Sequence, residues 1–185
     1  LNLYLALCHK VASSLLVPAE VQLAMAEARA LERATWPTRA RARRPLAEFV
    51  VASLQRRWTQ ALLAAERGFA LACEGGSVLM QGNFANGILV ALLGLGRVAE
   101  AVARSREIRG AVLPGPSGSA IPFIGTCARC ALVAGDVHAA RAHLAQLFEM
   151  CRAVNRMYFD FFGNLYPRLP LTECRLEDAA RLLGH

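Results

Sequence analysis

The chain has 185 residues, 55% of them hydrophobic, and a formal net charge of +7 at neutral pH. No uninterrupted apolar run approaches the roughly 18 residues of a membrane-spanning helix, and no secretory signal with a basic start, an apolar stretch and a cleavage site is recognisable. We therefore expect a protein of the cytoplasm, with no membrane attachment, whose Ala- and Leu-rich segments form a helical core.

The first predicted elements are two helices that pack together as an antiparallel hairpin. Residues 1–17 are apolar at most positions, and Pro18 suits the first turn of a second helix over 19–34. A polar connection that includes Trp36 is then expected to run to about residue 44. It contains the densest cluster of positive charge, Arg39, Arg41, Arg43 and Arg44.

Two further hairpins follow, each with an apolar first helix and a short turn. Pro45 is expected to begin the second hairpin, whose returning helix covers 58–73, and Ser77 is placed to cap the next helix. The third hairpin combines helices over 78–95 and 97–112.

The stretch from 123 to 148 is the clearest copy of this pattern. An apolar helix ends at Gly135, and Asp136 is placed to cap the amphipathic helix that follows. A fifth hairpin begins at Met157, and two prolines are expected to shorten its first helix.

A constant step of 39 residues relates these hairpins. It links Arg57, Gly96, Gly135 and Cys174, and in each copy Leu62, Ala101, Ala140 or Ala179 follows five residues later. The same step links Phe84, Phe123 and Phe162. Such a period is typical of solenoids, in which each hairpin buries its apolar face against its neighbours. We therefore predict an all-α fold, a right-handed superhelical array of about five antiparallel helix hairpins. The array is expected to be single over 1–185 and to be a fragment of a larger protein.

Three segments carry a family resemblance: RRWTQALLAAERGFALA, LLGLGRVAEAVARSREI and LVAGDVHAARAHLAQLFEM. They resemble tetratricopeptide repeats in the small residue before the turn and the small Ala of the second helix, although the common period is about 34. They are similar to the longer tetratricopeptide-like hairpins of bacterial signal-transducing ATPases and of LuxR-type or maltose-activator-like transcriptional regulators. The resemblance covers about residues 46–184 and implies a non-enzymatic interaction or effector-sensing module. The sequence contains neither the nucleotide-binding module nor the DNA-binding helix-turn-helix of those regulators.

Cys127 and Cys130 form a CxxC pair. A zinc site requires two more thiolates or imidazoles, usually in a second short-spaced pair, and the other cysteines offer none. In the 39-residue register Cys127 matches Phe49 and Ile88, which are apolar, so we predict that the pair packs as core residues. We expect no metal and no cofactor, and a metal or redox role for this pair is the alternative left open.

The remaining polar residues do not assemble a catalytic centre. Gly94 and Gly96 lack the third glycine of a nucleotide-binding loop and lie between helices. His138 and His143 are five residues apart, which does not bring two imidazoles to one helical face, and we expect both to be exposed. We therefore predict that this chain is not an enzyme.

A partner-binding surface is the remaining possibility. Solenoids present a concave face built from the first helix of each hairpin. The polar positions on these helices are Gln81, Asn83, Asn86, Arg129, Asn164 and Arg168. Arg129 and Arg168 are one step apart and are suited to an acidic or peptidic ligand, while ordinary solvated positions are the alternative. We expect a protein or peptide partner, a small effector, or neighbouring domains of the same polypeptide.

The cluster from Arg39 to Arg44 offers a second function. Clustered cations gain affinity for nucleic acid by releasing condensed counterions. The cluster lacks aromatic residues for base stacking, so we expect a solvated connection. A nucleic-acid-binding helical array remains the alternative.

Overall fold

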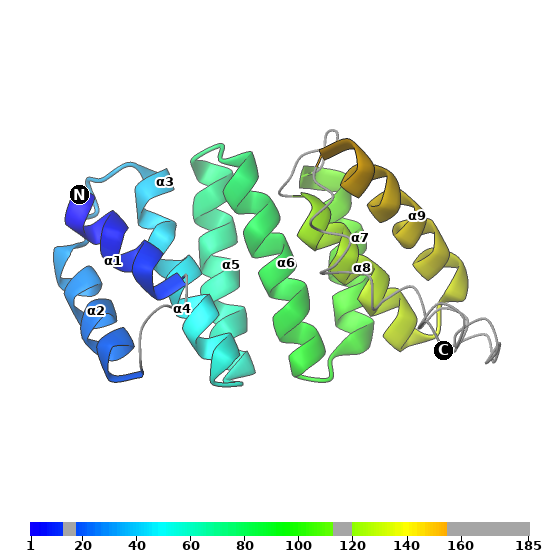
Figure 1. The fold of residues 1–185 in the computed structure, drawn as a ribbon, viewed down its shortest axis with the longest axis horizontal. Coiled ribbons are helices and arrows are strands. Elements are labelled where there is room, and N and C mark those ends of the chain that lie inside the picture. Colours follow the sequence, from blue (N-terminus) through cyan, green and yellow to red (C-terminus); the bar gives the residue numbers. More distant parts are fainter. Residues whose placement is uncertain (13–17, 113–119, 155–185) are drawn as a thin grey trace. The chain divides into compact units, whose positions relative to one another are not determined.

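The computed structural model describes residues 1–12, 18–112 and 120–154, and every regular element in these ranges is an α-helix (Figure 1). Neighbouring helices pack antiparallel, so the all-α prediction is confirmed for this part of the chain. The chain divides into two compact units, residues 1–95 and 96–185, and each is described by itself. The predicted fifth hairpin lies outside the described residues.

The first unit begins with α1 (Asn2–Ala12) and α2 (Pro18–Leu31), which pack on each other and on the later helix α4. Tyr4 is completely buried, and its hydroxyl donates a hydrogen bond to the carbonyl oxygen of Arg41 at 3.2 Å. Its ring meets Trp36 edge to face, with the centroids 5.0 Å apart. The bond to Arg41 satisfies the buried hydroxyl and ties the first helix to the segment after α2.

The predicted polar connection to residue 44 is wrong in its second half, because that segment is helical. The short helix α3 (Thr38–Arg41) leads through the buried Ala42 into α4 (Arg43–Leu54). Helix α4 therefore starts two residues before Pro45, which is tolerated in a first turn because the amide hydrogen that proline lacks would have no partner there.

Helices α5 (Trp58–Glu74) and α6 (Val78–Gly94) lie along each other, and α4 also packs against α5 (Figure 1). The contact between α5 and α6 depends on a missing side chain at Gly68. A Cβ built there would lie 2.1 Å from Cε1 of Phe84, whose ring is completely buried. The aromatic ring thus fills the space that the glycine leaves on the facing helix.

The second unit contains α7 (Val98–Val112), α8 (Ala120–Ala134) and α9 (Val137–Val154). Helix α8 packs against both α7 and α9, which explains why Phe123, Ile124 and Cys127 are almost completely buried. Leu147 of α9 is buried as well. Phe84 and Phe123 both lie in cores, as their 39-residue spacing predicts, while Phe162 is outside the described residues.

Four turns between helices share one backbone feature, a residue with positive φ after the first helix. These residues are Arg56 (φ 55), Gly76 (φ 62), Gly96 (φ 72) and Gly135 (φ 75). In each case the following helix begins two residues later, and Asp136 caps α9 as predicted, with its Oδ1 accepting from the amide of Ala139 at 2.9 Å. Ser77 occupies the N-cap position of α6, but the predicted hydrogen bond is wrong, because its side chain makes no cap hydrogen bond.

These turns correct the register of the predicted repeat. The residue equivalent to Gly96 and Gly135 is Arg56, not Arg57, so the first step is 40 residues and the second is 39. The completely buried alanine in the first copy is accordingly Ala61 and not Leu62. Eight residues before each turn residue stand Glu48, Ile88 and Cys127, so the predicted match of Cys127 with Phe49 is wrong.

Candidate binding groove

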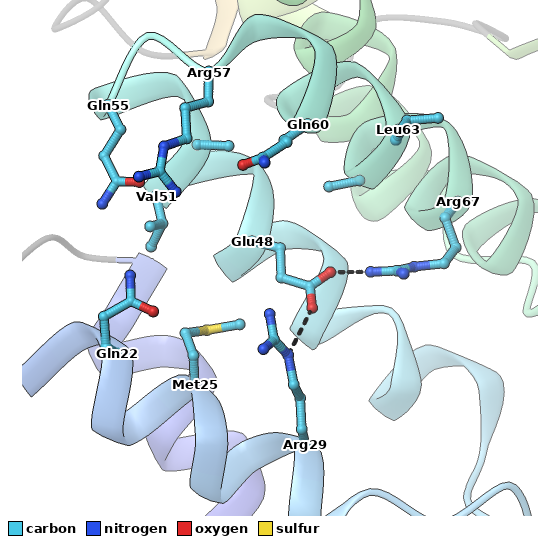
Figure 2. A pocket seen from close by; sticks show the side chains of 12 residues that line it. Gln22, Met25, Arg29, Glu48, Val51, Gln55, Arg57, Gln60, Leu63 and Arg67 are labelled. Carbon is cyan, nitrogen blue, oxygen red and sulfur yellow. Dashed lines mark hydrogen bonds and ion pairs between the residues drawn. The ribbon is translucent and has the colours of Figure 1, made fainter.

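Helices α2, α4 and α5 of the first unit enclose an open groove of ≈ 320 Å³ (Figure 2). Each of the three helices and the α4–α5 turn contribute side chains to it. Its lining residues are Gln22, Met25, Arg29, Glu48, Val51, Ala52, Gln55, Arg57, Gln60, Leu63, Ala64 and Arg67. Guanidinium and amide groups therefore line the groove together with aliphatic side chains.

Glu48 is the centre of an ion-pair cluster at one end of this groove. Its side chain is only 14% exposed and pairs with Arg29 at 3.5 Å, with Arg44 at 2.8 Å and with Arg67. Figure 2 shows the carboxylate between Arg29 of α2 and Arg67 of α5. Arg44 also pairs with Glu32. Because a buried carboxylate is stable only when its oxygens are paired, the cluster joins α2, α4 and α5 at this end.

The cations of the lining outnumber its anions. Three arginines line the groove and Glu48 is the one carboxylate among the lining residues. Burial lowers the pKa of the Arg67 guanidinium, and the neighbouring Arg44 cation lowers it further. Since a guanidinium nevertheless stays protonated at neutral pH, the groove keeps a positive charge that an anionic ligand could neutralise.

Arg57 lies at the other end, on the turn between α4 and α5. Its side chain is exposed and points toward the interior of the groove in Figure 2, where Gln55 and Gln60 also face inward. Within the described ranges no carboxylate pairs with Arg57, in contrast to Arg29 and Arg67. This end therefore presents a cation and two amides to any ligand that enters.

The binding residues predicted on a concave face fall in several places. Gln81, Asn83 and Asn86 lie half-buried on α6 of the first unit, and Arg129 lies half-buried on α8 of the second. Gln81 has a structural contact, since its Nε2 donates to the carbonyl oxygen of Ala72 at 3.2 Å near the end of α5. Asn164 and Arg168 lie outside the described residues, so the predicted pairing of Arg129 with Arg168 stays a prediction.

The CxxC pair lies in the interior of the second unit. Cys127 and Cys130 are each 1% exposed, and burial raises the pKa of each thiol to about 12. A thiol that is protonated at neutral pH is a poor nucleophile and a poor metal ligand. Across the described ranges, no group of three or more His, Cys, Asp or Glu side chains is arranged to hold a metal ion.

The two histidines of α9 differ in their surroundings. His138 is exposed as predicted, but His143 is half-buried with its Nδ1 3.1 Å from a guanidinium nitrogen of Arg109, so its predicted exposure is wrong. Burial, and then the Arg109 cation, lower the pKa of His143. The imidazole beside this cation is therefore neutral at physiological pH.

The basic cluster of the first unit is divided by the fold. Arg39 and Arg43 are exposed, Arg41 is half-buried, and Arg44 is held by Glu32 and Glu48. The cluster thus offers fewer available cations than its sequence implies.

Sequence reasoning missed the groove, although a signal was present. Glu48 breaks the apolar pattern of a first helix at the place where the other copies have Ile88 and Cys127. An ionisable residue at a core position predicts partners of opposite charge nearby. The register error of one residue put Phe49 at that place and concealed the signal.

No family model, no curated protein and no solved structure matches the chain. In the part of the chain that the structure describes, no helix is both long and apolar enough to span a membrane.

Proposed function

We propose that this chain is a non-enzymatic interaction scaffold that binds a peptide segment of a partner protein in the groove between α2, α4 and α5. The observation that carries the proposal is the groove, into which guanidinium and amide groups of two helices and a turn face together. Partner binding through such a surface needs no catalytic group.

The composition of the groove favours a peptide over a compact small molecule. Small-molecule sites are mostly apolar and enclose the ligand, whereas this groove is open and has many polar groups. The amides of Gln22, Gln55 and Gln60 can donate to and accept from a peptide backbone. Met25 and Leu63 supply aliphatic surface for its side chains.

We also propose that the hairpins stack as a single right-handed superhelical array of about five units, as in the tetratricopeptide-like regions of bacterial regulators and signalling ATPases. The recurring positive-φ turns support this proposal, as do the completely buried alanines Ala61, Ala101 and Ala140, each four residues into a second helix after its turn. A role in the cytoplasm belongs to the same proposal, and the five free cysteines among the described residues suit a reducing compartment.

Nucleic-acid binding is the second candidate function. It is favoured by the exposed side chains of Arg39 and Arg43 on neighbouring helices α3 and α4. Phosphate contacts would give affinity that falls steeply with salt. Titration of a labelled single-stranded oligonucleotide at two salt concentrations measures that slope, and Arg39→Ala with Arg43→Ala should reduce it if this function holds.

The proposed function is tested by selecting peptides from a random library displayed on phage against the whole chain and measuring their affinity by calorimetry. Gln60→Trp places a bulky side chain in the groove, while Thr59→Trp makes the same kind of change at the adjacent exposed residue that does not line it. We expect Gln60→Trp to weaken binding about tenfold or more, which corresponds to about 1.4 kcal/mol. Thr59→Trp should bind as the wild type does. Equal affinities for the two variants would contradict the proposal.

A further inference from the structure

We propose that the Arg57 end of the groove selects an acidic side chain, Asp or Glu, of the bound peptide. This inference rests on the proposed function and names the chemistry that its ligand must carry. It follows from the pairing of the arginines that line the groove. Arg29 and Arg67 pair with Glu48, whereas no carboxylate of the described residues pairs with Arg57.

The arginines that have a carboxylate partner lie around Glu48. Arg29 and Arg67 reach this carboxylate from the helices on either side, and Arg44 reaches it from one turn earlier on α4. A cationic peptide residue would have to displace one of these arginines to reach Glu48. The Glu48 end of the groove is therefore a poor receptor for a basic residue.

Arg57, which has two amide neighbours, has no carboxylate partner among the described residues. A guanidinium donates two parallel N–H bonds to one carboxylate, a geometry that an ammonium does not provide. Gln55 and Gln60, which line the groove beside it, carry amide N–H groups that can complete the coordination of a carboxylate oxygen. The excess of arginines over carboxylates in the lining favours an anion at this position.

A peptide fits this end better than a nucleic acid does. Single-stranded nucleic acid is bound by cations along its backbone together with aromatic side chains that stack on its bases. The residues that line the groove include no aromatic side chain. Aliphatic contacts from Val51 and Leu63 are suited to the methylene groups that flank a carboxylate in a peptide.

The experiment uses the whole chain and an oriented peptide library, in which one central residue is fixed in turn as each amino acid and the others are degenerate. We expect pools with Asp or Glu at the fixed position to bind most tightly. Arg57→Glu should weaken these pools about tenfold or more, as expected when a charge-assisted hydrogen-bonded pair is replaced by repulsion. Arg57→Lys should keep the acidic preference and bind less tightly than the wild type, because it retains the charge without the bidentate geometry.

Arg56→Glu is the matched control, since Arg56 is the adjacent exposed arginine of the same turn and does not line the groove. Both variants change the net charge equally, so a general electrostatic effect would weaken both alike. Retained acidic binding in Arg56→Glu together with its loss in Arg57→Glu supports the inference. An equal loss in both variants would overturn it.

Different results would contradict peptide binding in the groove and the selection of an acidic residue by Arg57. If Gln60→Trp abolishes peptide binding but the pools show no acidic preference, the groove binds peptides and the selection by Arg57 is wrong. If no pool binds the wild-type chain, both proposals are wrong. If a single-stranded oligonucleotide binds more tightly than any pool and Arg57→Glu abolishes that binding, the ligand is a nucleic acid and the acidic-peptide inference is overturned.

Discussion

Among single residues, Arg56 adopts a left-handed backbone conformation that is unfavourable for a residue with a Cβ. Arg56 has a φ of 55°, in the region where the other three helix-ending turns have glycine. The turn is nevertheless closed by two backbone bonds, from the amides of Arg56 and Arg57 to the carbonyls of Ser53 and Ala52 at 3.0 and 2.8 Å. The hydrogen bonds of the turn thus offset the unfavourable backbone angle.

We predict that Arg56→Gly stabilises the chain by about 0.5–1 kcal/mol. A left-handed conformation costs about 1–2 kcal/mol for a residue with a Cβ, and the greater freedom of glycine in the unfolded chain takes back part of this gain. The free energy of unfolding from urea denaturation measures the effect. Gly76→Arg, which places a Cβ at the same kind of position in the next turn, should lose stability. A loss of stability in Arg56→Gly would show that the arginine side chain stabilises the turn.

Among the helices, glycines that face aromatic rings set how closely neighbouring elements approach. Gly68 of α5 faces the ring of Phe84 on α6, and Gly94 at the end of α6 faces Trp58 on α5, where a Cβ would lie 2.3 Å from the indole ring. The two aromatic residues thus pack directly against helix backbone. The two glycines and the two aromatic rings together fix the α5–α6 pair.

We predict that Gly68→Ala destabilises the chain by about 1–3 kcal/mol, the usual range for overpacking a core, although alanine is the better helix former. The matched control is Gly110→Ala in α7, where an added Cβ meets nothing within 4 Å. The free energy of unfolding of that variant should rise by about 0.5–1 kcal/mol from helix propensity alone. Thermal unfolding followed by circular dichroism compares the two. A gain of equal size in both would mean that α5 and α6 are not in close contact.

The helices themselves could be predicted from the sequence, and the groove could not. Apolar spacing and the glycine turns place α5 and α6 within about one residue of their observed bounds. The step between copies was not predictable to one residue, since it is 40 residues from Arg56 to Gly96 and 39 from Gly96 to Gly135. The assumption of a constant step of 39 hides Glu48, whose partners Arg29 and Arg67 are on other helices and so cannot be paired by local spacing.

At the scale of the whole molecule, each compact unit has its own interior, and the groove belongs to the first one. The cluster around Glu48 joins three helices at one end of the groove and leaves Arg57 available at the other. A binding site on helices that are held together in this way is preorganised, which reduces the entropy lost on binding. We expect a partner to bind in this groove and not at the polar residues of α6.

The most direct test is a titration of the isotopically labelled chain with a peptide selected from the library, followed by amide chemical shifts in NMR spectra. We expect the largest changes at Arg29, Gln55, Arg57 and Gln60, with smaller changes elsewhere in the first unit. Changes centred on Gln81, Asn83 and Asn86, with the groove amides unmoved, would contradict the account.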